Sequence, residues 1–192
     1  TVLARYAQFS ARTGRKREAS ESIERALRLD PLNPLIRRAA GTIDYAARNY
    51  DAAIAELQRA LQMNPRMSQA HAAIGDALQM LGRLPEAQAE YAAEPVPDFR
   101  LTGLAIVEFR QDRKPQSEAA FSELVATEGD RVLYQQAQVL AQWGRLQEAL
   151  ERLERGFQAG DSGLIYARND PFLDPLRGER RFAELLNTLG FD

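Results

Sequence analysis

Side chains that could carry out acid–base or metal chemistry are few in this sequence. His71 is the single histidine and there is no cysteine, so a two-histidine zinc motif and a thiolate nucleophile are both excluded. Carboxylates such as Asp112 and Glu118 lie close in sequence, but no pattern fixes their geometry. His71 is one helical turn before Gly75, where a packing side chain usually stands. We therefore predict no catalytic residue, no metal and no cofactor, and interpret His71 as a core or partly buried residue, with a functional role as the alternative.

Basic side chains gather at one point, around Gly14. Arg12, Arg15, Lys16 and Arg17 could dock an acidic or phosphorylated partner. They could equally form a solvated turn, because cations are favoured at a helix C-terminus. We favour the solvated turn. The net charge of the whole chain is −2, so no bulk field indicates nucleic acid as a partner.

The elements that would hold these residues are best seen in residues 41–65. The sequence there predicts one helix that ends near Ala47, a tight turn, and a second helix from about Tyr50 to Met63. Pro65 ends the second helix, because proline lacks the N–H group and clashes with the preceding turn. The unit is therefore an antiparallel pair of helices.

This helix pair recurs along the chain. Pro31 and Pro65 each follow an Asp or Asn, and their spacing of about 34 residues is shared by small residues at the expected helix contacts. An alanine-rich bundle has no reason to keep a fixed period. The recurring small residues are Ala7, Gly41, Gly75, Ala105 and Ala137 on the first helices and Ala19, Ala53, Ala87, Ser117 and Ala149 on the second helices.

These residues resemble the pattern of tetratricopeptide-repeat proteins. The resemblance implies an all-α fold, a right-handed superhelical solenoid of antiparallel helix pairs that ends in a C-terminal capping segment. The expected array covers residues 1–160, and the cap covers 161–192. The expected repeats are residues 1–31, 32–65, 66–97, 98–129 and 130–160.

Two prolines interrupt the third repeat. Pro95 and Pro97 cannot lie inside a helix, so we expect non-helical backbone over 94–98 and a bend or a shift in register there. Asp98 is then predicted to be the N-cap of the next helix. The linker is too short and apolar to predict a flexible domain boundary.

After Gly160 the period fails. Asp161, Asp170 and Asp174 are predicted to cap short helices, the last two with proline at the first helical position. Residues 179–189 are predicted to form a last helix with one apolar face. We interpret 161–192 as the cap, because a terminal repeat has one face toward water. The alternative is that the tail is a ligand-like segment that docks reversibly on a partner or in the binding groove.

The tail, RNDPFLDPLRGERRFAELLNTLGF, also resembles the repeat region of bacterial multidomain regulators. In that group the repeats follow a winged-helix, nucleotide-cyclase or Ser/Thr kinase domain, none of which is visible here. The resemblance implies the regulatory or sensory part of a larger protein, and a chain that begins inside a helical pattern without methionine fits that expectation. No apolar run approaches 18 residues, so no transmembrane helix is predicted. We expect a cytoplasmic location, with the periplasm as the alternative.

The leading functional hypothesis is a non-enzymatic protein–protein interaction module that binds a peptide or protein segment, without nucleic-acid or membrane contact. Amides, aromatics and arginines on a concave surface suit such a ligand. The Lys/Asn/Arg carboxylate clamp of some tetratricopeptide proteins is absent at Ala4, Gln8, Thr42, Gln69 and Ala73. The predicted groove residues are Gln8, Arg12, Arg38, Tyr45, Gln69, Asp76, Gln79, Phe109, Tyr134, Gln138 and Gln142.

Two other hypotheses stay open. Phe99, Ile106 and Phe109 could form an exposed apolar patch for self-association, which would make the chain an oligomerisation platform. Alternatively, the chain could be the regulatory region of a cyclase, kinase or transferase whose catalytic domain is absent from this sequence.

Overall fold

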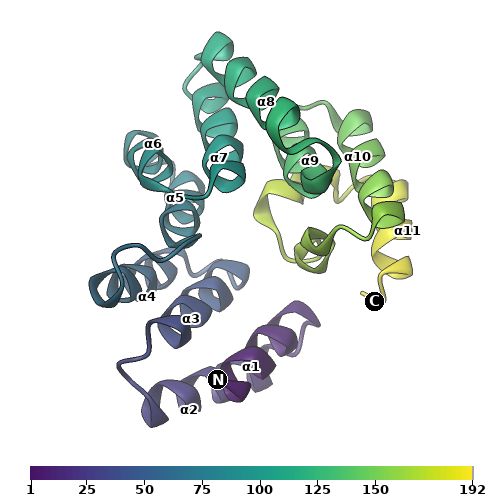
Figure 1. Ribbon diagram of the computed structural model, residues 1–192. Helices are drawn as coiled ribbons and strands as arrows, with labels where there is room; N and C mark the ends of the chain where they lie inside the picture. The colour runs from purple at the N-terminus through teal and green to yellow at the C-terminus, as the bar shows by residue number, and fades with distance from the viewer. Residues whose placement is uncertain (192) are drawn as a thin grey trace. The chain divides into compact units, whose positions relative to one another are not determined.

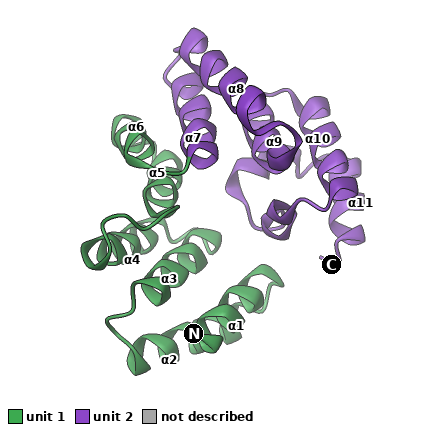
Figure 2. Cartoon of the chain, in the orientation of Figure 1, with its two compact units in different colours: residues 1–96 green, residues 97–192 purple. Residues whose placement is uncertain are grey.

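The computed structural model describes residues 1–191, which form α-helices and short 3-10 helices with no strand among them (Figure 1). Asp192, the last residue of the predicted cap, lies outside the described residues. The chain divides into two compact units, residues 1–96 (unit 1) and residues 97–192 (unit 2), which are coloured separately in Figure 2.

Unit 1 consists of antiparallel helix pairs that stack in chain order. The first helix of each pair, called here the A helix, contacts the A helix of the next pair, so that α1 packs on α3 and α3 on α5. The helices are α1 (Val2–Arg12), α2 (Lys16–Leu29), α3 (Pro34–Ala46), α4 (Tyr50–Met63), α5 (Ala70–Met80) and α6 (Leu84–Ala93).

Unit 2 contains further helix pairs followed by an irregular tail. The A helices here are α7 and α9, which also contact each other. The elements are α7 (Pro97–Arg110), α8 (Lys114–Glu128), η1 (Gly129–Val132), α9 (Leu133–Gln142), α10 (Leu146–Ala159), η2 (Ser162–Tyr166), η3 (Pro171–Leu176) and α11 (Arg180–Thr188).

The recurring small residues lie where the two helices of a pair touch, and all ten are buried. A Cβ added at Gly41 would lie 2.6 Å from Leu57 Cγ and 3.0 Å from the Ala53 carbonyl oxygen. In the fourth pair, Ser117 takes the alanine position, and its hydroxyl donates to the Ala105 carbonyl at 2.5 Å. The helices of each pair therefore approach too closely for larger side chains.

The turn between the helices of each pair requires a left-handed residue. Glycine supplies it at Gly14, Gly82 and Gly144, with φ between 74° and 79°. Arg48 and Asp112 adopt the same conformation in the second and fourth pairs, at φ 67° and 59°. These two residues carry a steric cost that the glycines avoid.

The proline pair separates α6 from α7. Helix α6 ends at Ala93, and the C-cap residue Glu94 has an extended backbone. Its carboxylate is 1% exposed and accepts from the backbone N–H groups of Gln69 and Ala72 at 3.0 and 3.1 Å. Glu94 therefore satisfies N–H groups in the first turn of α5 that have no partner within that helix.

The prediction for Asp98 was wrong in its position. Helix α7 already begins at Pro97, so Asp98 lies in the first turn of the helix rather than before it. Its Oδ1 accepts from the Phe99 N–H at 2.9 Å. Proline is well suited to the first helical position, because its missing N–H would have no partner there.

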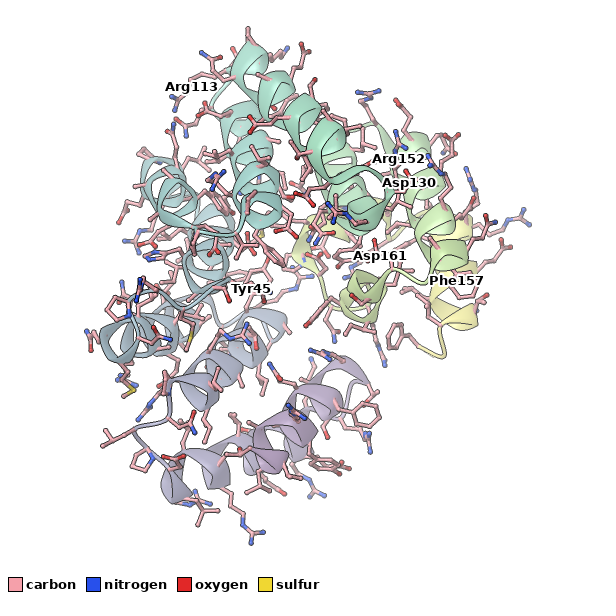
Figure 3. The ribbon with its side chains drawn as sticks, viewed as in Figure 1. Tyr45, Arg113, Asp130, Arg152, Phe157 and Asp161 are labelled. Carbon is pink, nitrogen blue, oxygen red and sulfur yellow. The ribbon has the colours of Figure 1, made fainter. Side chains whose placement is uncertain are left out.

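Two aspartates begin the tail elements, and a third does not. Asp161, labelled in Figure 3, accepts from Gly163 N–H at 2.8 Å as the N-cap of η2. Its other carboxylate oxygen accepts from Tyr134 N–H in the first turn of α9 at 2.9 Å. Asp170 caps η3 in the same way. Asp174 was expected to cap a separate helix, but η3 continues through Pro175.

The core of unit 2 joins the tail to the last helix pair. The tail contributes large apolar side chains from η2, η3 and α11, which pack against α9 and α10. The Trp143 ring lies at the edge of this core. Buried tail residues in the cluster are Leu164, Ala167, Leu173, Leu176, Phe182 and Leu185.

Candidate protein-binding surface

Polar side chains link successive A helices in unit 1. Gln8 on α1 donates through Nε2 to Thr42 Oγ1 on α3 at 3.2 Å. Arg38 on α3 donates to Gln69 Oε1, beside the start of α5, at 3.0 Å. We call this row of side chains the A-helix surface; it is partly exposed at Gln8, Arg12 and Arg38.

The same row continues within unit 2, where it meets the tail. Arg110 on α7 donates to Gln142 Oε1 on α9 at 2.6 Å. The Gln142 side-chain amide in turn donates to the backbone carbonyl of Phe172 at 2.7 Å, and Gln138 donates to Asp170 Oδ2 at 2.6 Å. Segment 170–176 is thus held on α9 by the side chains that sequence reasoning assigned to the groove.

Asp170 is the polar centre of this contact. It is 7% exposed and accepts from the Tyr134 hydroxyl at 2.5 Å and from the Phe172 N–H at 2.8 Å. Burial raises the pKa of Asp170 above its ordinary value, although these donors oppose the shift. Burial, followed by the neighbouring Asp170 charge, raises the pKa of Tyr134 well above its ordinary value.

Two predicted groove residues are buried rather than exposed. Gln79 is 2% exposed and donates to the Tyr91 hydroxyl at 2.7 Å, while that hydroxyl donates to Asp76 at 2.7 Å. Tyr134 is 4% exposed. Gln79 therefore fills the interior of the third pair, and Tyr134 lies under the tail.

Phe109, which was predicted both in the groove and in an exposed apolar patch, is partly buried and packs against another aromatic side chain. The Phe109 and Trp143 rings are 6.0 Å apart, and Phe121 meets Trp143 edge-on at 5.0 Å. Ile106 is fully buried and Phe99 is partly buried. The apolar patch expected from Phe99, Ile106 and Phe109 is therefore not an exposed surface.

The remaining predicted residues keep a partly exposed position on unit 1. The Tyr45 ring, labelled in Figure 3, lies 5.8 Å from the Tyr50 ring. Asp76 is partly buried as the acceptor for Tyr91. Two residues of this contact were not among the predicted groove residues: Arg110, which belongs to the row, and Asp170 of the tail, which accepts from Gln138. The repeat spacing could have identified Arg110, because it precedes the predicted groove residue Gln142 by 32 residues, close to one repeat.

No arrangement for catalysis or metal binding emerges among the described residues. His71 Nδ1 on α5 lies 2.7 Å from Glu90 Oε2 on α6, and both side chains are about one quarter exposed. No cluster of three or more potential metal ligands occurs in residues 1–191. Of the helices described, none has both the length and the apolar character that crossing a membrane requires.

Comparison with protein-family models finds tetratricopeptide repeats in the first half of the chain, at residues 38–98 and 1–31. No curated protein sequence matches the chain.

Solved structures share its fold at low sequence identity. PilW, a widely conserved type IV pilus biogenesis factor, is 20% identical, with a TM-score of 0.63 over 98% of this chain and 90% of that chain. PilF of Pseudomonas aeruginosa is 16% identical, with a TM-score of 0.62 over 98% and 89%. A tetratricopeptide repeat protein of Parabacteroides merdae is 15% identical, with a TM-score of 0.56 over 98% and 77%.

Proposed function

Because the chain carries tetratricopeptide repeats within an all-helical solenoid fold, a fold that supports protein–protein interaction, we propose that it binds an extended protein segment on the A-helix surface of unit 1. The side chains assigned to this contact are those of the predicted groove that stay partly or fully exposed in unit 1. They are Gln8, Arg12, Arg38, Tyr45, Gln69 and Asp76.

The observation that carries the proposal is the way α9 holds the chain's own tail. Gln142 recognises a backbone carbonyl, and Gln138 recognises a carboxylate. Recognition of backbone groups by side-chain amides tolerates many ligand sequences and suits an extended segment. The A helices of this protein therefore present side chains of a kind that can hold a chain segment.

Unit 1 presents comparable side chains at the equivalent positions. Counted from the small contact residue of each A helix, Gln8 on α1 corresponds to Gln138 on α9, and Arg12 corresponds to Gln142. Amide and guanidinium groups both donate hydrogen bonds to carbonyl and carboxylate oxygens. The surface on α9 is filled by segment 170–176, so the proposed ligand site for another protein lies on unit 1.

Arginines in this row favour a ligand segment that contains acidic residues. Arg12 and Arg38 lie on α1 and α3, and guanidinium groups bind carboxylates with two parallel hydrogen bonds. Asp76 on α5 adds a negative group at the other end of the row. The proposed ligand therefore carries a carboxylate near its contact with α1 and α3.

The test is selection of ligands from a displayed library of random peptides, followed by affinity measurement on variants. Arg38→Ala and Gln8→Ala are expected to weaken a selected peptide about tenfold each, the size expected for a buried polar contact. Gln58→Ala, on the exposed face of α4, is the matched control and should leave affinity unchanged. Equal affinity for all three variants would contradict the proposal.

We also propose a role for this chain within a larger protein. The resemblance of the tail to bacterial multidomain regulators supports a function as the regulatory part of a larger protein, in the cytoplasm. We propose no enzymatic activity for this chain. Self-association through Phe99, Ile106 and Phe109 has no support from an exposed patch, since Ile106 is fully buried.

A further inference from the structure

Helix α5 begins differently from α3, the A helix before it. Asn33 caps α3 by accepting from the Leu35 N–H at 3.0 Å. Helix α5 has no side-chain cap of this kind, and Gln69, at its N-cap position, has φ 66° and ψ 0°. That left-handed conformation costs an L-residue free energy that glycine would not lose. Such a residue persists only where its surroundings fix it, and strained residues cluster at ligand sites.

Glu94 fixes the backbone of Gln69. Its carboxylate is 1% exposed and accepts from the Gln69 N–H at 3.0 Å, and from the Ala72 and Val96 N–H groups at 3.1 Å. The Gln69 and Ala72 N–H groups at the start of α5 are therefore occupied by the protein, and they are not offered to an anion. What remains exposed at this point is the Gln69 side chain.

The Gln69 side chain contacts Arg38. Its Oε1 accepts from Arg38 Nη1 at 3.0 Å, so its Nε2 group is left as a donor. A guanidinium has several N–H groups in a planar fork, and the one hydrogen bond that Arg38 makes within residues 1–191 uses Nη1. Arg38 is partly exposed. It is thus held through one nitrogen, with an amide donor beside it.

The charged groups around α3 leave Arg38 outside any ion pair within residues 1–191. Helix α1, which packs on α3, contains Arg5 and Arg12 and no acidic residue. The acidic side chains on α3, beside it and on the other elements packed against it are engaged elsewhere or lie in an exposed first turn. Glu18, Glu21 and Glu24 pair with Arg15, Arg17 and Arg28, Asp30 accepts from Asn33, Asp44 bonds Asn49, Glu56 pairs with Arg37 and Arg59, Asp76 accepts from Tyr91, and Asp51 is exposed in the first turn of α4.

We propose that Arg38 binds the carboxylate of an Asp or Glu side chain in the peptide ligand, and that Gln69 is the positioning residue that orients the guanidinium for it. The inference rests on the peptide function proposed above and specifies its chemistry at one point. The Nε and Nη2 groups of an arginine match the two oxygens of a carboxylate. Glu94 supports the pair from the interior by holding the Gln69 backbone.

The experiment compares matched peptides on the full chain. A peptide selected from the random library is synthesised with an amidated C-terminus, and again with each acidic residue changed in turn to its amide. Fluorescence anisotropy should show that one acidic residue improves affinity about tenfold, the size of one charge-assisted contact. Arg38→Ala should remove this preference. Selected peptides without an acidic residue, or equal affinity of acidic and amide forms, would overturn the inference and leave the peptide function intact.

Gln69→Gly tests the positioning role, because it relieves the left-handed backbone and keeps the N–H that Glu94 accepts. The preference for the acidic peptide should fall about fivefold, as for the loss of one hydrogen bond, while the denaturation midpoint should stay the same or rise. Gln69→Glu places a carboxylate against Arg38 and should make the amide peptide the tighter ligand. A purely structural role for Gln69 predicts neither result.

Asp112→Gly is the matched control. Asp112 has the same left-handed conformation, at φ 59°, in a turn of unit 2, so glycine relieves the same strain at a residue outside the proposed site. The preference between the two peptides should not change. A preference that Gln69→Gly leaves intact, or that Asp112→Gly lowers equally, would overturn the positioning role. Failure to select any peptide would contradict the peptide function itself, and this inference with it.

Discussion

The first and the last helix pairs described here differ in how their outer faces are covered. The outer face of α1 exposes Val2, Tyr6 and Phe9. The outer face of α9 and α10 is covered by η3 and α11, whose Phe172 and Phe182 are at most 2% exposed. Among residues 1–191 the α1 face is therefore exposed, and we call it the open end; the face of α9 and α10 is covered by the tail, and we call it the closed end.

The difference shows how the tail covers the apolar face of the last helix pair. The tail does not continue the repeat, and its short 3-10 helix η3 contacts α9 where another A helix would otherwise lie. It replaces regular helix with capped turns at Asp161 and Asp170 and fixes them by polar contacts to α9. Among residues 1–191 no such segment lies on the outer face of α1, where Val2, Tyr6 and Phe9 are exposed.

The largest expected effect comes from removing the closed end. Deletion of residues 170–192 should lower the free energy of unfolding by several kcal/mol, because each large buried side chain contributes roughly 1.5–3 kcal/mol before the cost of ordering the tail. Chemical denaturation measures this loss, and binding of a hydrophobic dye should rise. An unchanged midpoint would mean that the tail docks reversibly and does not close the core.

Gly163 gives a sharper test with a single methyl group. A Cβ at this position would lie 2.6 Å from Tyr134 Cγ and 2.7 Å from its Cβ, and the ring cannot move away easily because Asp170 holds its hydroxyl. Gly163→Ala should therefore destabilise by about 3 kcal/mol. Gly178→Ala, in the same tail with no atom within 4 Å of the added Cβ, is the control. Equal midpoints for the two variants would show that η2 is not fixed against α9.

Asp170 makes the closed end sensitive to pH. Burial raises the pKa of Asp170 in the folded protein. The protonated Asp170 carboxyl therefore stabilises the fold fully below the unfolded pKa of about 3.9. This stabilisation is lost as pH rises through the folded pKa. Asp170→Asn should remove this dependence. At neutral pH it should also destabilise by about 2 kcal/mol, since an amide cannot accept from all three donors.

The measurement is the free energy of unfolding of both proteins between pH 3 and 7, about the range in which a carboxylate titrates. The difference, wild type minus Asp170→Asn, should decrease with rising pH. Asp174→Asn changes a partly exposed carboxylate that pairs with Arg177 and should cost at most about 1 kcal/mol. A difference that increases with pH would show that the hydrogen bonds to Asp170 outweigh its burial.

The smallest effect is expected at the open end. Phe9→Ser and Val2→Ser replace exposed side chains, so each should change the free energy of unfolding by about 0.5 kcal/mol or less. Thermal or chemical denaturation of the isolated protein measures this. A loss of more than about 2 kcal/mol, comparable with a core substitution, would mean that α1 is covered and that the comparison between the two ends fails.

The period of the sequence was sufficient to locate the helix pairs, because close contact leaves room only for small residues. It also predicted the tight turn within residues 41–65, where Arg48 takes the left-handed conformation that Gly14 takes in the first repeat. It could not decide which polar residues are exposed. Gln79 satisfies the Tyr91 hydroxyl inside the third pair, a contact that depends on a large tyrosine lying against Gly75.

The tail was less accessible to sequence reasoning, because no repeat constrains it. Asp161 and Asp170 could be identified as N-caps from the residues that follow them. Their second contacts, with Tyr134 across 27 and 36 residues, depend on how the tail crosses α9. The binding role of the A-helix surface stays a prediction for the same reason, since no local pattern specifies a ligand.

Glu94 determines where a fragment that contains only the first three repeats should end. A fragment ending at Ala93 would contain every residue of α1–α6, yet it would lack the carboxylate that receives the N–H groups of Gln69 and Ala72. Glu94 also receives the N–H of Val96 at 3.1 Å. An expression boundary for the first three repeats therefore belongs after Val96, three residues beyond the end of the last helix.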